Sequence, residues 1–230
     1  MGDLMCTADV RRVAIPASVA DCEVRDGWFF AQDVNAWSSL AYVAVGLYIV
    51  GAVGRRGLPG VFVVLGVATA LEGVGSLLYH GVGGPAAEVV HDGALVALLG
   101  FVAGWHVGRL AGAAERAALV GLGTGLAVGV VAGTTSSPLT NVAVAVGVVV
   151  IIGAEVLARH RGLTPVWTLP LLVFAAAAVL AWQLGASSSL ACAEESWIQP
   201  HALWHALSAV LVAACIGRAA EAHSRSTWRA

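Results

Sequence analysis

The chain contains no lysine and few charged residues of any kind. All twelve of its basic residues are arginines, and charged residues make up 11% of the 230 positions, whereas a soluble domain carries about 25%. A seven-helix retinal protein needs a lysine for its Schiff base, so the absence of lysine excludes that class. With a net charge of −2 and no basic patch, we expect no nucleic-acid partner.

The N-terminus also lacks the features of a cleavable signal peptide. Residues 1–27 contain no continuous apolar run and are rich in acids. We therefore expect residues 1–35 to form a polar extracytoplasmic arm and residues 218–230 to form a cytoplasmic tail. Both would belong to a single membrane domain that covers residues 1–230.

What the chain has in abundance is long apolar runs. Hydrophobic residues make up 59% of it, and its mean hydropathy is +0.85. Each run is about as long as a helix that crosses a bilayer, which predicts an all-α membrane protein built as a bundle of seven transmembrane helices. The predicted spans are 36–54, 61–80, 88–108, 117–133, 141–158, 166–185 and 198–217.

The arginines follow every second span, which predicts the orientation of the bundle. The loops after the second, fourth and sixth spans contain none. Because positive residues favour the cytoplasmic side, the N-terminus is expected outside and the C-terminus inside the cell (inner) membrane. The arginines on the predicted cytoplasmic side are Arg55, Arg56, Arg109, Arg116, Arg159, Arg161, Arg218, Arg225 and Arg229.

Polar residues that a membrane does not readily accommodate gather at the outer ends of three spans. His80 closes the second span, with Ser76 one turn earlier, and Asp92 opens the third. His201 and His205 open the seventh. Three segments that are distant in the sequence are thus expected to bring polar groups to one depth on one side.

The spacing of these histidines favours a metal site. His201 and His205 are at i and i+4 and share a helix face, which is a good bidentate arrangement. We expect His80 to be the third ligand, because its helix also offers the Ser76 hydroxyl. Three imidazoles leave one position open, as in catalytic zinc sites. The alternative is that these histidines only make hydrogen bonds at the membrane interface.

Glu72 and the other histidines allow more than one interpretation. His91 could be a ligand or support one, and Glu72, two turns before His80, either lines a cavity or pairs within the bundle. His106 is expected to be a core or interfacial histidine, and His160 a solvated one.

Together these motifs resemble the CREST superfamily of seven-span membrane hydrolases. Ser76-x-x-x-His80, Asp92 and His201-x-x-x-His205 carry the resemblance, which covers the whole seven-span layout. It implies a zinc ion held by the three histidines, with Asp92 and Ser76 assisting an activated water.

The N-terminal stretch resembles one branch of that superfamily, the alkaline ceramidases, through Cys22-Glu23 and the segment NAWS at 35–38. This implies a calcium site that includes Glu23. Two further calcium-ligand positions of the family are Arg25 and Gln32 here, which departs from the pattern. Acids that could compensate are Asp21, Asp26 and Asp33.

The cysteines are placed where a disulfide can form. Cys22 precedes the first span and Cys192 follows the sixth, so both are expected outside, in a compartment that permits disulfides. Cys6 is also expected outside and is the rival partner. The resemblance to the alkaline ceramidases implies the Cys22–Cys192 pairing.

The chemistry that these parts imply is hydrolysis of an amide. Zinc lowers the pKa of a bound water to about 7 and polarises a carbonyl. We expect Asp92 to take a proton from that water and pass it to the leaving amine, while Ser76 donates to the oxyanion. An amide at this depth comes from a lipid such as ceramide, so a fatty acid and a sphingoid base are the expected products, formed near the extracytoplasmic face.

Two other functions remain open at this stage. The chain could be a metal-containing receptor or lipid-binding protein of the same superfamily, although the receptors have a cytoplasmic N-terminus. It could also be a transporter that uses its histidines for metal or proton passage, although no polar path continues through the fourth to sixth spans.

Overall fold

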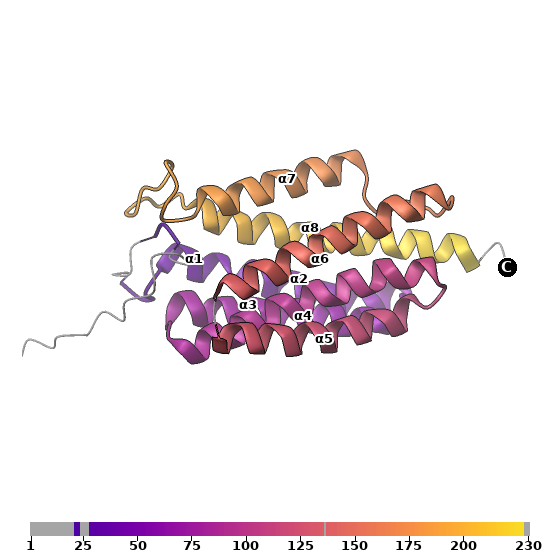
Figure 1. Ribbon diagram of the computed structural model, residues 1–230, viewed down its shortest axis with the longest axis horizontal. Helices are drawn as coiled ribbons and strands as arrows, with labels where there is room; N and C mark the ends of the chain where they lie inside the picture. The colour runs from indigo at the N-terminus through magenta and orange to yellow at the C-terminus, as the bar shows by residue number, and fades with distance from the viewer. Residues whose placement is uncertain (1–20, 24–27, 136, 228–230) are drawn as a thin grey trace, which may run out of the picture.

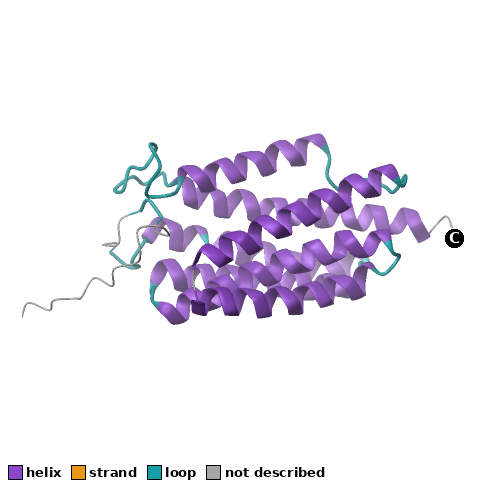
Figure 2. Ribbon diagram, in the orientation of Figure 1, coloured by secondary structure: helices purple, strands orange, loops and turns teal. Residues whose placement is uncertain are grey.

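The computed structural model describes residues 21–23, 28–135 and 137–227, and most of them are helical (Figure 1 and Figure 2). One isolated β-bridge, between Asp21 and Ala186, lies outside the helices. The helices in the described part are α1 (Asp33–Ser38), α2 (Leu40–Arg56), α3 (Val61–Gly81), α4 (Pro85–Leu110), α5 (Ala114–Thr135), α6 (Ser137–His160), α7 (Leu169–Leu184) and α8 (Pro200–Thr227).

Glycine and proline mark several helix boundaries. Gly57 ends α2 with a φ of 61°, and Gly84, with a φ of 90°, precedes α4. Positive φ is accessible to glycine without steric cost. Pro85 occupies the first position of α4, where its missing N–H and fixed φ suit a helix start.

Six helical stretches are long and apolar enough to cross a membrane, with α1 and α2 counted as one. They correspond to every predicted span except the sixth, so the chain is a multi-pass, all-helical membrane protein. The predicted span 166–185 corresponds to α7, which has 16 residues. At 1.5 Å per residue it is about 24 Å long, shorter than the roughly 30 Å hydrocarbon core.

The late start of α7 has a local cause. The carboxylate oxygen Oε1 of Glu155 accepts hydrogen bonds from the backbone N–H groups of Val166 and Trp167. These residues therefore satisfy their backbone groups in a loop, and the helix begins at Leu169, just before Pro170. The sequence-based range for this span was too long at its N-terminal end.

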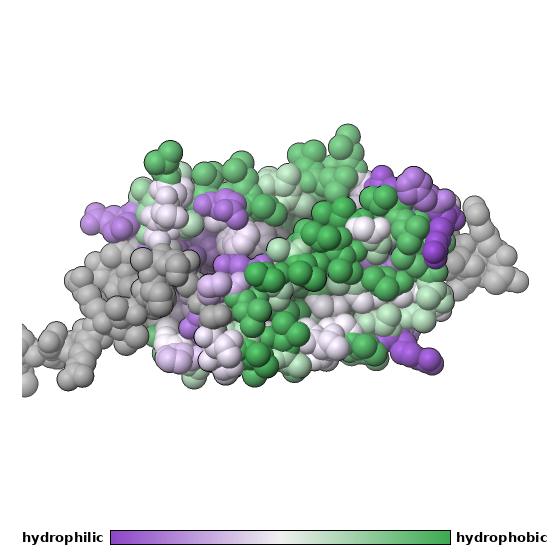
Figure 3. All heavy atoms as spheres, in the orientation of Figure 1, coloured by the Kyte–Doolittle hydropathy of each residue, from purple (hydrophilic) through white to green (hydrophobic). Residues whose placement is uncertain are grey.

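The outside of the bundle is apolar between its two ends. Figure 3 shows hydrophobic side chains over the middle of one face and hydrophilic residues mainly towards the ends. Each of four apolar side chains on this surface is more than half exposed: Leu47 at 65%, Val131 at 54%, Val149 at 67% and Val173 at 62%. Such a surface suits lipid, because bilayer hydrocarbon solvates it while the helices satisfy their own backbone groups.

Small residues allow α4 and α5 to pack closely. A Cβ added at Gly100 would lie 2.2 Å from the Gly121 carbonyl oxygen, and one added at Gly121 would lie 2.1 Å from the Gly100 oxygen. Backbone contact of this kind is how membrane helices gain van der Waals packing. This pair of helices fixes the position of Asp92, near the start of α4.

One end of the bundle collects the elements that carry the predicted site. The C-terminal end of α3, the start of α4 and the start of α8 lie there beside α1 (Figure 1). The Cys22–Cys192 disulfide joins the N-terminal arm to the loop between α7 and α8, with a Cα–Cα distance of 5.3 Å. The implied pairing is therefore confirmed, and Cys6 lies outside the described residues.

Candidate metal centre

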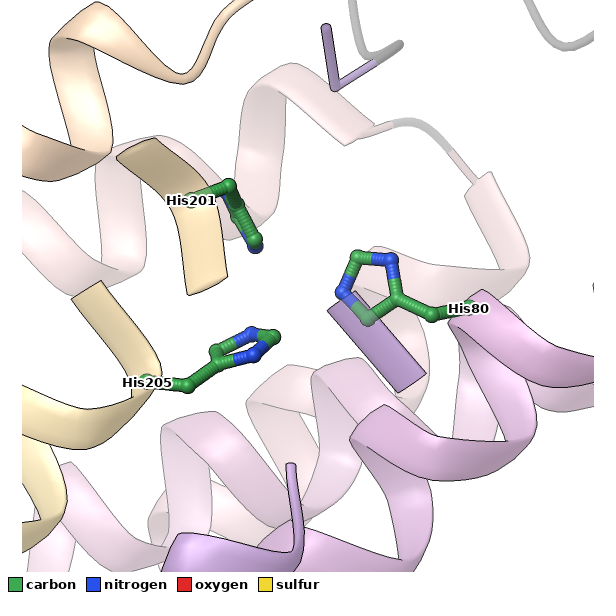
Figure 4. Close-up of side chains that lie close together, drawn as sticks. All are labelled: His80, His201 and His205. Carbon is green, nitrogen blue, oxygen red and sulfur yellow. The ribbon is translucent and has the colours of Figure 1, made fainter. Parts of the chain in front are cut away.

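Three histidines meet at this end of the bundle. His80 comes from the last turn of α3, and His201 and His205 come from the first two turns of α8 (Figure 4). Their ring centroids are 4.7–5.1 Å apart, and each offers a ligand atom within 4.8 Å of the other two. All three are buried. The predicted convergence of α3 and α8 is present in the structure.

The hydrogen bonds of His205 indicate which of its nitrogens carries the proton. The Ser38 hydroxyl donates to the Asn35 carbonyl oxygen at 2.8 Å, and its oxygen lies 2.8 Å from Nδ1 of His205. Because the hydroxyl hydrogen is already used, Ser38 accepts the Nδ1–H of His205. The lone pair of a neutral His205 ring is then on Nε2.

His80 is held in the same tautomer. The Gln32 amide nitrogen donates to the Glu23 carbonyl oxygen at 2.7 Å, which orients its Oε1 towards Nδ1 of His80, also at 2.7 Å. An amide oxygen only accepts, so Nδ1 of His80 is the donor. Gln32 is buried, and it links a metal-ligand candidate to the backbone of the N-terminal arm.

His201 faces a carboxylate instead of an amide or a hydroxyl. Oδ1 of Asp21 lies 3.0 Å from Nδ1 of His201, and Oδ2 lies 3.5 Å from Nδ1 of His80. Asp21 is therefore close enough to pair electrostatically with both imidazoles, although Nδ1 of His201 makes no hydrogen bond within the described residues. We call Asp21, Gln32 and Ser38 the outer acceptors, because each faces the outer nitrogen of a different histidine.

This arrangement fits a zinc ion. Metal-binding histidines usually donate their second ring N–H to an oxygen, which fixes the tautomer and aims the other nitrogen at the metal. For His80 and His205 this puts the lone pair on Nε2, which is then the nitrogen that would bind the metal. Nitrogens at about 2.0–2.1 Å from a tetrahedral zinc lie about 3.4 Å apart, so small ring rotations from the present spacing would suffice. Three such ligands leave a fourth position open.

Ser76 lies beside this centre, as the sequence predicted. It is fully buried one turn before His80, and its hydroxyl oxygen lies 3.3 Å from Nε2 of His205 and 2.9 Å from the Ser39 hydroxyl. Because Ser39 donates to the Asn35 carbonyl, the Ser76 hydroxyl donates to the Ser39 oxygen here. A rotation about its Cβ–Oγ bond would turn the same hydrogen towards the centre.

Asp92 faces the same cavity as the histidines but is held by other partners. Its Oδ1 lies 2.9 Å from Nδ1 of His91, and its Oδ2 accepts a hydrogen bond from the Thr140 hydroxyl of α6. Sequence reasoning missed Thr140, because nothing near it in the chain indicates that α6 approaches Asp92. His91 also lies 3.8 Å from Glu72, so it pairs with two acids. Glu72 both lines the cavity and pairs within the bundle.

A large cavity extends from the histidines along the inside of the bundle. Its volume is about 1090 Å³. Apart from the polar groups at its two ends, its walls are largely apolar, with side chains from α4, α6, α7 and α8. Representative lining residues are Leu95, Phe101, Val148, Leu172 and Leu211. The cavity can hold an elongated apolar molecule with one end at the histidines.

A second buried polar cluster closes the opposite end. Glu155 accepts a hydrogen bond from Arg109 at 3.1 Å and lies 3.4 Å from Nδ1 of His106. Trp167 donates its indole N–H to Nε2 of His106 at 3.3 Å. His106 is buried, as predicted for a core histidine. This cluster joins α4, α6 and the loop before α7.

Glu23, the residue that matched a family calcium ligand, caps α1 with its side chain. Its two carboxylate oxygens accept the backbone N–H groups of Val34 and Asn35 at 2.7 and 2.8 Å. Burial raises the pKa of the Glu23 carboxyl, while these two hydrogen bonds oppose the shift. Arg25 and Asp26 lie outside the described residues.

Asp33 is likewise engaged with the backbone, because its carboxylate accepts the N–H groups of Trp28 and Phe30 at 2.7 Å each. Its side chain therefore orders residues 28–30.

No protein-family model matches the chain, and no curated protein matches it.

Proposed function

We propose that the protein is a zinc-dependent intramembrane hydrolase of lipid amides, similar in its site motifs to the alkaline ceramidases of the CREST superfamily. One observation carries the proposal. Three buried imidazoles meet at the head of a long apolar cavity, two of them with the outer nitrogen hydrogen-bonded to an oxygen and the third beside the Asp21 carboxylate. Three protein ligands with an open fourth position are typical of catalytic rather than structural zinc.

The proposed topology has seven spans, with the N-terminus outside and the C-terminus inside the inner membrane. In support, α7 lies alongside α8, although it is shorter than α6 and α8 (Figure 1). Arg55, Arg109 and Arg159 lie in the last turns of α2, α4 and α6, at the end opposite the three histidines. By the positive-inside rule, the histidines are then near the extracytoplasmic face.

A zinc ion bound by the three histidines would supply an activated water and polarise the scissile carbonyl. Asp92, positioned by Thr140 and His91, would accept a proton from the attacking water and deliver it to the leaving nitrogen. The Ser76 hydroxyl would donate a hydrogen bond to the oxygen that gains negative charge. The amide and one water thereby become a carboxylic acid and an amine.

The substrate class follows from the surroundings of the site. The cavity is apolar and lies inside a membrane bundle, so the amide that reaches it carries long hydrocarbon chains. An N-acyl sphingoid base such as ceramide has this chemistry, and its hydrolysis yields a fatty acid and a sphingoid base. Membrane lipids are the other proposed partners.

The proposal is tested by zinc quantification on the purified protein together with fatty-acid release from a panel of lipid amides. The wild-type protein should contain stoichiometric zinc and hydrolyse at least one of them. The single variants His80→Ala, His201→Ala and His205→Ala should lose zinc and activity together. His160→Ala is the matched control, because His160 is exposed at the C-terminal end of α6, and this variant should retain both zinc and activity.

Asp92→Asn separates an enzyme from a receptor or a transporter. It should retain zinc and lose hydrolysis by about 10²–10⁴-fold, the usual contribution of a positioned acid–base group. Wild-type protein without zinc would overturn the mechanism. Zinc-loaded protein that hydrolyses none of the amides would favour a receptor or lipid-binding protein instead.

A further inference from the structure

Asp21 lies between the outer nitrogens of two metal-ligand candidates. Its Oδ1 is 3.0 Å from Nδ1 of His201 and its Oδ2 is 3.5 Å from Nδ1 of His80. Its side chain is 13% exposed. We propose that Asp21 is a positioning residue for the zinc site, and that the Cys22–Cys192 disulfide holds it in place.

The backbone around Asp21 is fixed by three neighbouring interactions. Cys22, the next residue, forms the disulfide with Cys192, and its N–H donates to the Gly185 carbonyl oxygen at 2.8 Å. Asp21 itself forms the isolated β-bridge with Ala186. The short segment 21–22 is therefore attached to the end of α7 and to the loop that leads into α8.

Gly185 connects this attachment directly to a ligand. A Cβ added at Gly185 would lie 2.7 Å from both the backbone nitrogen and the Cβ of His201. The arm, the end of α7 and the start of α8 are thus in contact at this point. The position of the Asp21 carboxylate relative to His201 is set by backbone contacts on both sides of the pair.

The Asp21 carboxylate is expected to affect both the orientation of His201 and the charge around the metal site. It lies within ion-pairing distance of Nδ1 of His201 and adds negative charge next to a site for a cation. A small rotation of the His201 ring on metal binding would let Nδ1–H donate to this carboxylate and would direct Nε2 to the metal. Loss of such an outer partner typically lowers metal affinity about 10–100-fold. Gln32 is the nearer acceptor for His80, at 2.7 Å, so the larger effect of Asp21 is expected on His201.

This assignment rests on the proposed function, because it requires that the three histidines bind zinc. The first experiment compares the zinc dissociation constants of the wild type and Asp21→Asn by competition with a chelator. The amide is isosteric with the carboxylate but offers one acceptor oxygen in place of two and has no charge. We expect about 10-fold weaker binding or more. Glu194→Gln, an exposed acid in the same loop as Cys192, is the matched control and should bind as the wild type does.

A spectroscopic measurement distinguishes positioning from a general loss of structure. Cobalt(II) in place of zinc has visible absorption bands that depend on the geometry of its ligands. Asp21→Asn should alter these bands while the metal-free protein melts at the wild-type temperature. Unchanged bands together with unchanged zinc affinity would overturn the assignment.

The disulfide is tested by a double-mutant cycle. Cys22→Ser with Cys192→Ser should also weaken zinc binding, and adding Asp21→Asn should cost little more, because residues that act as a unit are not additive. Fully additive losses would show that the disulfide does not act through Asp21. Wild-type protein that binds no zinc would overturn the proposed function, whereas wild-type affinity and wild-type cobalt bands in Asp21→Asn would overturn this assignment alone.

Discussion

The Ser38 hydroxyl oxygen lies 2.8 Å from Nδ1 of His205, although 167 residues separate the two in the chain. Because the same hydroxyl donates to the Asn35 carbonyl, it accepts from the imidazole and places the His205 lone pair on Nε2. Ser38 ends α1, a six-residue helix that Glu23 caps. A short polar helix at the head of the bundle thus determines the tautomer of a ligand on α8.

Ser38→Ala is expected to weaken zinc binding about 10–100-fold, because His205 loses the oxygen that holds its outer nitrogen. The measurement is the zinc dissociation constant by chelator competition. Thr124→Ala is the control, since the Thr124 hydroxyl is exposed on α5 and bonds only to carbonyls of its own helix. Equal zinc affinity in Ser38→Ala and the wild type would show that Ser38 does not orient the ligand.

Ser76→Ala is expected to affect the reaction more than the metal. Removing a hydrogen-bond donor to a developing oxyanion costs about 10²–10³-fold in kcat. The zinc content should remain stoichiometric, because Ser76 is not one of the three nitrogen ligands. The measurement is kcat with the best lipid amide, at saturating substrate and full zinc occupancy. Unchanged kcat in this variant would remove Ser76 from the proposed mechanism.

The histidines could be predicted from the sequence because the membrane restricts the possible structures. A bilayer admits helices whose ends alternate between two sides, so a layout of seven spans predicts the end of the second and the start of the seventh on the same side. The i, i+4 spacing then put His201 and His205 on one face. These two constraints were enough to bring them to His80 without knowledge of how the helices pack.

The outer acceptors could not be predicted in the same way. Asp21 and Gln32 lie in an irregular arm whose path depends on a disulfide and on single hydrogen bonds, such as that from Gln32 to the Glu23 carbonyl. The sequence drew attention to both residues, but as positions related to calcium. Thr140 was missed because its contact with Asp92 depends on how α6 crosses α4, which periodicity does not determine.

Packing between α4 and α5 should influence the position of Asp92. A Cβ added at Gly129 would lie 2.4 Å from the Asp92 carbonyl oxygen and 2.8 Å from the Gly93 Cα. Gly129→Ala must therefore separate the two helices at the level of Asp92, and we expect lower thermal stability and lower hydrolytic activity. Gly123→Ala is the control, because nothing lies within 4 Å of its added Cβ. Equal melting temperatures and rates for the two variants would contradict the close packing described above.

The polar cluster around Glu155, at the end of the cavity opposite the three histidines, should affect thermal stability and not zinc affinity. Glu155 is 4% exposed and joins Arg109, His106 and the backbone before α7. Glu155→Ala leaves the guanidinium of Arg109 without its carboxylate partner, and breaking a buried pair in this way costs about 3–5 kcal/mol. We expect a clear fall in the melting temperature of the detergent-solubilised protein, measured with zinc bound. Glu115→Gln, an exposed acid in the first turn of α5, should leave the melting temperature unchanged. If Glu155→Ala instead lowered zinc affinity and left the melting temperature at the wild-type value, the two ends of the cavity would be coupled in a way that the hydrogen bonds described here do not explain.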